Sequence, residues 1–100
     1  MSVATSGLAQ QAEIEERVER LQELFANDPE IARIHHRFAE DWSGDYSLFI
    51  EVVLNKKAPT AATVVRLSRE FGAQLLRVVR SEELGLHSYF NFSSKPENDQ

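Results

Sequence analysis

The chain has 100 residues, 42% of them hydrophobic, so it can support one domain with a modest core. Its formal charge of −5 disfavours nucleic acid as a partner, and the absence of cysteine excludes disulfides, thiolate metal sites and thiol nucleophiles. No apolar run approaches the ~18 residues that a membrane span needs, and the N-terminus lacks a secretory signal pattern, so we expect a cytoplasmic protein without membrane contact.

The first predicted element is an amphipathic helix from about Ala9 to Ala26. Its apolar positions recur every three or four residues, which is the spacing of one buried helical stripe. They are Ile14, Val18, Leu21 and either Leu24 or Phe25. Pro29 cannot continue a helix and follows its exit. Residues 1–8 are small and polar, and we expect them to be flexible.

Two β-strands joined by a short turn come next. In the run from Ile31 to Phe38 polar and apolar residues alternate, so one face carries Ile34, His36 and Phe38 and the other carries Arg33, His35 and Arg37. Gly44 can supply the positive φ that a turn between antiparallel strands often needs. The following run, SLFIEVVL, is apolar on nearly both faces, which is typical of a central strand.

A second helix and a third strand complete the unit. Thr60 is the predicted N-cap of the helix, and Gly72 is placed for close packing on the sheet. The buried stripe is predicted to consist of Val64, Leu67, Phe71, Leu75 and Val78. Gly85 suits a left-handed helix stop. The last strand presents Leu86, Ser88, Phe90 and Phe92 on one face and His87, Tyr89 and Asn91 on the other.

This order of elements predicts an α+β fold, an α-β-β-α-β two-layer sandwich. Both helices should cover one face of a three-stranded mixed sheet within a single domain, residues 9–92. The crossover from the second strand to the third should be right-handed if those strands are parallel. The polar tail, residues 93–100, is predicted to be disordered.

The sheet face without helices carries the candidate binding residues, which are His35, Phe49, Glu51, Val53, His87 and Tyr89. If solvated, Phe49, Val53 and Tyr89 would form an apolar patch of the kind that marks an interface. Four interpretations of this face stay open: self-association, cover by the N-terminal helix, a surface for a ligand or partner, and an active site.

His35, His87 and Glu51 form the candidate metal set. If their strands align, two imidazoles and one carboxylate would converge, a combination that zinc and iron use. Their spacing is not a metal motif, so the metal assignment stays unknown. His36 points to the opposite face and is predicted to be a hydrogen-bonded core residue.

Three further features have ordinary structural interpretations. The carboxylates around the turn lack the spacing of a calcium loop and predict a solvated turn; they belong to Glu40, Asp41 and Asp45. Trp42 either packs back on the domain or anchors a partner. The arginines of the second helix are interleaved with glutamates and predict a solvated face; they are Arg66, Arg69, Arg77 and Arg80.

No nucleophile motif and no phosphate-binding glycine loop is present, so we expect no cofactor and favour a role without catalysis. The segments RIHHRF, SLFIEVVL, the helix from Thr60 and SYFNF follow an order that resembles the cytoplasmic domain of cation diffusion facilitator transporters, over about residues 10–92. Those domains are metallochaperone-like and homodimeric, so the resemblance implies a homodimer. EDWSGDY and YFNFSS also resemble parts of short bacterial proteins of unassigned function, which implies a bacterial origin.

The sequence thus predicts a small homodimeric interaction module that binds a partner protein through the open sheet face or Trp42. The alternative is a small ligand- or metal-binding sensor domain that uses His35, His87 and Glu51. An enzyme acting through the same residues ranks third.

Overall fold

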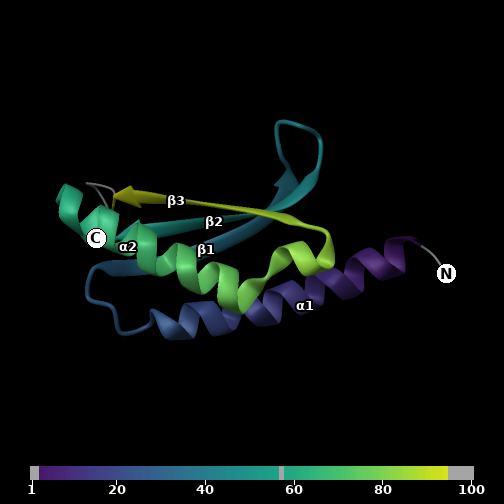
Figure 1. Ribbon diagram of the computed structural model, residues 1–100, viewed down its shortest axis with the longest axis horizontal. Coiled ribbons are helices and arrows are strands. Elements are labelled where there is room, and N and C mark those ends of the chain that lie inside the picture. Colours follow the sequence, from purple (N-terminus) through teal and green to yellow (C-terminus); the bar gives the residue numbers. More distant parts are fainter. Residues whose placement is uncertain (1–2, 57, 95–100) are drawn as a thin grey trace.

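A computed structural model describes residues 3–56 and 58–94, with side chains from Gln10 onwards (Figure 1). The elements follow one another as α1 (Val3–Leu24), β1 (Ile31–Glu40), β2 (Tyr46–Leu54), α2 (Ala61–Gln74), η1 (Leu75–Val79), η2 (Ser81–Leu84) and β3 (His87–Ser94). η1 is a π-helical turn that continues α2, and η2 is a short 3-10 helix. The predicted α+β class and the α-β-β-α-β order are confirmed.

The strands form one mixed sheet in the order β1-β2-β3. β1 runs antiparallel to β2, and β3 runs parallel to it. β2 occupies the central position that its composition predicts, since it carries apolar residues on nearly both faces. The side chains of its core face are fully or almost fully buried; they are Leu48, Ile50, Val52 and Leu54.

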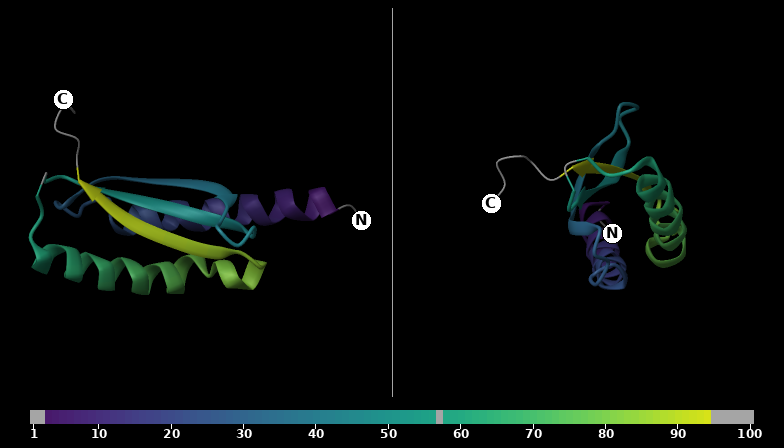
Figure 2. Two further views of the ribbon diagram at one scale, coloured as in Figure 1. Left: turned by 90° about the horizontal axis from the view of Figure 1, so that it is seen from above. Right: turned by 90° about the vertical axis from the view of Figure 1, so that its left-hand side faces the viewer.

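Both helices lie against the same face of the sheet, and the opposite face carries no helix (Figure 2). α1 buries the predicted stripe, with Phe25 rather than Leu24 in its last position. Phe71 of α2 joins the layers, since its ring centroid lies 5.2 Å from that of Phe25 and 5.2 Å from that of Phe90. Among the described residues, no helix is both long enough and apolar enough to span a bilayer.

The end of the second helical stripe differs from the prediction. Val79 is fully buried, while Val78 is only half-buried. A regular α-helix would have placed Val78 on the buried face, but the π-helical turn η1 contains more residues per turn and rotates the next position inward. The predicted N-cap is present: the Thr60 hydroxyl accepts a hydrogen bond from the Thr63 backbone N–H at 3.1 Å.

The two ends of the domain extend further than expected. α1 begins at Val3 rather than Ala9. The sequence did not indicate this earlier start, because the apolar period that marks the helix begins only at Ile14. β3 continues to Ser94. Residues 1–2 and 95–100, which belong to the predicted flexible ends, lie outside the described residues.

Arg17 connects α1 to the end of the second helix. Its guanidinium donates to the backbone carbonyl oxygens of Val79 at 2.9 Å and Arg80 at 3.4 Å. It also contacts the carboxylates of Glu83 at 3.2 Å and Glu13 at 3.5 Å. Carbonyl groups at a helix end lack partners within the helix, so Arg17 supplies hydrogen bonds that the backbone itself cannot make.

Candidate functional site

The open face of the sheet is the side without helices, and its side chains form rows across the strands. One row contains His35, Glu51 and Asn91, and the next contains Arg37, Phe49 and Tyr89. A third row contains Ala39, Ser47 and His87. Side chains within one row are direct cross-strand neighbours, so each row forms one local environment.

The middle row continues into the hairpin as a continuous stack. The Trp42 and Tyr89 ring centroids lie 4.9 Å apart, and those of Tyr89 and Phe49 lie 5.3 Å apart at an interplanar angle of 25°. The Arg37 guanidinium carbon lies 4.7 Å from the Phe49 ring centroid, within the range of a cation–π contact. We call Trp42, Tyr89, Phe49 and Arg37 the aromatic row.

Asp41 holds this row in place from the hairpin. Its Oδ2 accepts hydrogen bonds from the hydroxyls of Tyr89 at 2.8 Å and Ser47 at 3.2 Å. Its Oδ1 accepts from the Ser43 hydroxyl at 2.7 Å, the Ser43 backbone N–H at 2.9 Å and the Asp45 backbone N–H at 3.0 Å. One carboxylate thereby shapes the turn and also fixes the phenol of Tyr89.

These hydrogen bonds shift the titration of both partners. The hydrogen bond from the Ser43 hydroxyl, with those from Tyr89 and the backbone, holds the pKa of Asp41 well below its usual range, against the opposing effect of burial. The hydrogen bond to Asp41, with burial, raises the pKa of Tyr89. At neutral pH the pair is therefore an ionised carboxylate and a neutral phenol, the states in which Tyr89 can donate.

Trp42 ends the aromatic row and is 82% exposed. Its indole contacts Tyr89, yet most of its surface faces solvent. The sequence left open whether Trp42 packs back or is offered to a partner, and the structure combines a local contact with high exposure. A large apolar ring that is oriented and exposed is a suitable interface anchor.

The candidate metal residues do not come together. His35 pairs with Glu51, but His87 pairs with Ser47, which lies four residues before Glu51 in β2. The Nε2 of His87 lies 3.6 Å from Oδ2 of Asp45, at the turn. Within residues 3–56 and 58–94, no three His, Asp or Glu side chains are grouped so that they could hold a metal ion.

A shallow depression of about 240 Å³ separates the first two rows. The open-face side chains at its rim are His35, Arg37, Phe49, Glu51 and Asn91. They provide hydrogen-bond donors, one carboxylate and one aromatic ring. This depression brings together three of the residues that the sequence singled out for binding, namely His35, Phe49 and Glu51.

Two expectations for the sheet residues were wrong in detail. Val53 lies on the open face but is only 4% exposed, because it occupies the central strand between Arg33 and Ser93. It therefore adds no exposed apolar surface to Phe49 and Tyr89. His36 lies on the helix-covered face but is only half-buried at the sheet edge, where its ring stands edge-on to Phe38 at 6.1 Å. None of the described residues hydrogen-bonds to its side chain.

Comparison of the chain with protein-family models, curated proteins and solved structures finds no match. The likeness to transporter domains therefore stays an expectation, and the site must be interpreted from its own chemistry.

Asp41 is the important residue that sequence reasoning missed. We expected Asp41 to belong to a solvated turn, but it is only 9% exposed. A signal was present: an aspartate at the start of a turn favours a conformation in which its carboxylate accepts the backbone N–H two residues further on. The hydrogen bond to Tyr89 was not predictable, because 48 residues separate the two.

Proposed function

We propose that the protein is a non-enzymatic, homodimeric interaction module of the cytoplasm that binds a partner protein through its aromatic row. The observation that carries this proposal is the high exposure of Trp42 at the end of a stack that Asp41 holds in place.

The energetics of protein interfaces support this assignment. Tryptophan, tyrosine and arginine are the residues that most often dominate binding energy, and all three occur in the aromatic row. Because the Tyr89 hydroxyl is already bonded to Asp41 and the Phe49 ring packs on Tyr89, little side-chain entropy remains to be lost on binding. The cost of association is correspondingly low.

The row also indicates the chemistry of the partner. Trp42 offers an apolar anchor, and the Arg37 guanidinium lies over Phe49 on the same surface. A partner segment that places an apolar side chain on Trp42 and a carboxylate beside Arg37 would satisfy both groups. The homodimer must then form through another surface, so that Trp42 stays free.

The test compares Trp42→Ala with Tyr46→Ala in cells that express the chain naturally. Tyr46 is the matched control, since it is an exposed aromatic of the same hairpin outside the aromatic row. We expect chemical cross-linking and mass spectrometry to recover one stoichiometric partner with the wild type and with Tyr46→Ala. For Trp42→Ala we expect an affinity about 30-fold lower, the usual loss for an interface hot spot.

Sedimentation velocity on the same three proteins at micromolar concentration tests the homodimer. All three should sediment as dimers. A monomeric wild type would contradict the dimer, and a Trp42→Ala variant that alone is monomeric would assign the aromatic row to self-association instead. Equal recovery of the partner by Trp42→Ala would contradict the proposed anchor.

A small-ligand sensor is the second candidate, and the depression beside the aromatic row favours it. Its polar rim suits a ligand that exchanges hydrogen bonds with His35, Glu51 and Asn91. Ligand binding there would shift the amide resonances of those residues. It would leave the affinity for the protein partner unchanged, in the wild type and in Trp42→Ala alike.

A further inference from the structure

β1 is an edge strand of the sheet, with β2 on one side and no described strand on the other. Next to the hairpin, the backbone N–H of Asp41 donates to the carbonyl oxygen of Asp45 at 2.8 Å. Hydrogen-bonded pairs alternate along an antiparallel ladder, so the backbone groups of His36, Phe38 and Glu40 point away from β2. We call these three residues the outer edge of β1.

A contact from α1 supports this assignment. The side-chain amide of Gln22 donates to the carbonyl oxygen of Ile34 at 3.0 Å, and Ile34 is the next residue of the same alternation. Within the described chain, the outward backbone groups of His36, Phe38 and Glu40 have no hydrogen-bond partner. An unpaired strand edge of this kind is a template for an added strand. Gln22 closes the edge at Ile34, so residues 36–40 remain open to it.

α1 runs along the helix side of this edge. Oε1 of Gln11 lies 3.5 Å from the hydroxyl of Tyr46, the cross-strand neighbour of Glu40, while Gln22 contacts the other end of the edge. Gln11 and Gln22 are about three helical turns apart, so they lie on one side of α1. Glu15 follows Gln11 by about one turn and lies on that same side. The helix side of the edge therefore includes a carboxylate of α1.

The two sides of the edge carry different charges. On the helix side, Glu15 and Glu40 are exposed, and neither forms an ion pair within the described chain. On the open side, His35 and Arg37 are exposed and offer N–H donors, and neither meets a carboxylate among the described residues. A strand that joins this edge would therefore have acceptors for cations on one side and donors for anions on the other.

We propose that the outer edge of β1 binds an extended segment of another protein in which basic and acidic residues alternate, and which adds as an antiparallel strand. Successive side chains of an added strand point to opposite faces of the sheet. Its basic residues would lie on the helix side, near Glu15 and Glu40, and its acidic residues on the open side, beside His35 and Arg37. Alternation fixes the register, because a shift by one residue places every charge on the wrong side.

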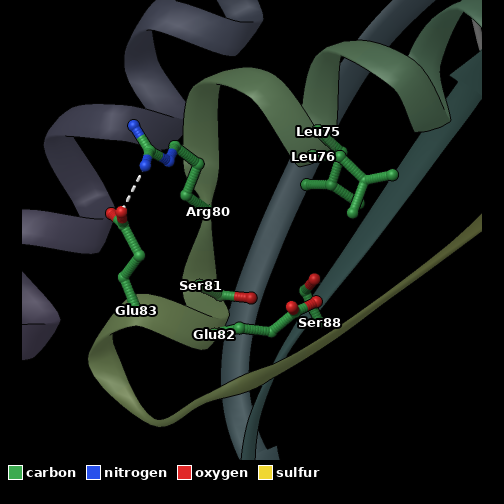
Figure 3. A pocket seen from close by; sticks show the side chains of 7 residues that line it. All are labelled: Leu75, Leu76, Arg80, Ser81, Glu82, Glu83 and Ser88. Atoms are coloured by element: carbon green, nitrogen blue, oxygen red, sulfur yellow. Dashed lines mark ion pairs between the residues drawn. The ribbon is translucent and has the colours of Figure 1, made fainter.

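Two alternatives fit the charges less well. A second copy of β1 presents the same charges on the same two sides, so like charges would face each other across the new pair. The opposite edge of the sheet, β3, contains no Asp, Glu, Lys or Arg. Its first residues also lie beside the end of the second helix, since Leu76 and Ser88 line one small pocket (Figure 3). Charge complementarity therefore favours the β1 edge and a segment of another protein.

The probe is the peptide Ac-(Lys-Glu)4-NH2, titrated into the full-length protein and followed by ¹⁵N–¹H NMR. We expect saturable binding with a Kd on the order of millimolar for so short a peptide. Hydrogen exchange should slow at the amides of His36, Phe38 and Glu40 but not at those of Arg37 and Ala39, which already donate to β2. The control peptide Ac-(Lys-Lys-Glu-Glu)2-NH2 has the same composition without alternation and should bind at least about fivefold more weakly.

Backbone N-methylation of the peptide tests the pairing itself. In an antiparallel pair, the lysines that share a face with Phe38 direct their backbone N–H groups at β1. Methylation of the four lysine backbone nitrogens should therefore abolish binding. Methylation of the four glutamate backbone nitrogens is the matched control and should be tolerated, because those N–H groups point to solvent.

Charge reversals test the helix side of the edge. Glu15→Lys and Glu40→Lys should each weaken peptide binding about fivefold, since an attraction is replaced by a repulsion. Glu16→Lys makes the same change of charge at an exposed position on another side of α1 and should leave binding unchanged. Trp42→Ala should bind the peptide like the wild type, which separates this site from the partner site proposed at the aromatic row.

Four results would overturn the proposal: no saturable binding, equal binding of the two peptides, equal losses on methylation of lysine and glutamate nitrogens, or equal weakening by Glu15→Lys and Glu16→Lys. The first three use the wild type alone, so they remain decisive if a variant fails to fold. Loss of peptide binding in Trp42→Ala would also contradict it, because the peptide would then occupy the aromatic row.

Discussion

Asp41 shows how much one side chain can determine in this small domain. Its carboxylate receives hydrogen bonds from the turn residues Ser43 and Asp45 and from Ser47 and Tyr89 on two strands. Hydrogen bonds to a charged acceptor are the strong ones, and all of these favour the ionised form. The shape of the hairpin and the position of the aromatic row therefore depend on the charge of a single residue.

We predict that stability in acid depends on this carboxylate. The pKa of Asp41 is lower in the folded state than its ordinary value of 3.8. Ionised Asp41 therefore favours the folded state above about pH 4, and this contribution is lost as the pH falls below that value. The urea midpoint of the wild type, measured by circular dichroism from pH 7 to pH 2, should decrease once the pH is below about 4.

Asp41→Asn separates this effect from general acid denaturation. Its midpoint should be lower than that of the wild type at pH 7, and the difference between them should shrink as the pH approaches 2. Glu19→Gln removes an exposed carboxylate of α1 and should follow the wild type throughout. A difference between wild type and Asp41→Asn that stays constant with pH would contradict this role.

At the scale of elements, α2 packs on the sheet through a position without a side chain. A Cβ atom added at Gly72 would lie 3.5 Å and 3.7 Å from two ring carbons of Phe90. These are ordinary van der Waals distances, so the close packing expected at Gly72 is present but leaves room for a methyl group. Glycine here costs helix stability without being required for the fit.

Gly72→Ala should therefore raise the free energy of unfolding by about 0.5–1 kcal/mol. The control is Gly85→Ala, where φ is 75° and alanine is strained; this change should lower the free energy of unfolding by about 1–2 kcal/mol. Urea denaturation at neutral pH measures both. Destabilisation by Gly72→Ala would show that Phe90 cannot accommodate the added methyl group.

At the scale of the whole molecule, α1 is held by its apolar stripe and by Arg17. Ile14, Val18 and Leu21 are fully buried against the rest of the core. Arg17 lies between them and the end of the second helix, where it meets the carbonyl oxygen of Val79. This contact joins residues that are 62 positions apart, so it forms only when the whole domain is assembled.

Arg17→Met should lower the free energy of unfolding by about 1.5–3 kcal/mol, the usual value for hydrogen bonds of a charged group. Methionine retains the apolar part of the side chain, so the loss reports on the guanidinium. Arg20→Met is the matched control on the exposed side of α1 and should change the free energy by less than about 0.5 kcal/mol. Equal losses of unfolding free energy for Arg17→Met and Arg20→Met, measured by urea denaturation, would contradict this role of the Arg17 guanidinium.

Much of this architecture follows from local patterns. The apolar period from Ile14 to Phe25 marks α1, the doubly apolar run Leu48–Leu54 marks the central strand, and Thr60 marks the start of α2. Alternation along each strand also assigns His35, Phe49, Glu51 and Tyr89 to one face. Such assignments succeed because they depend only on the geometry of one helix or one strand.

The sequence by itself determined the order of the elements and the face on which each strand residue lies. Only the tertiary structure decided which residues meet: His35 with Glu51 but not with His87, Asp41 with Tyr89, and Arg17 with Val79. The physical reason is that periodicity within an element is local, whereas the register between β2 and β3 and the π-helical turn at η1 depend on how the whole chain packs.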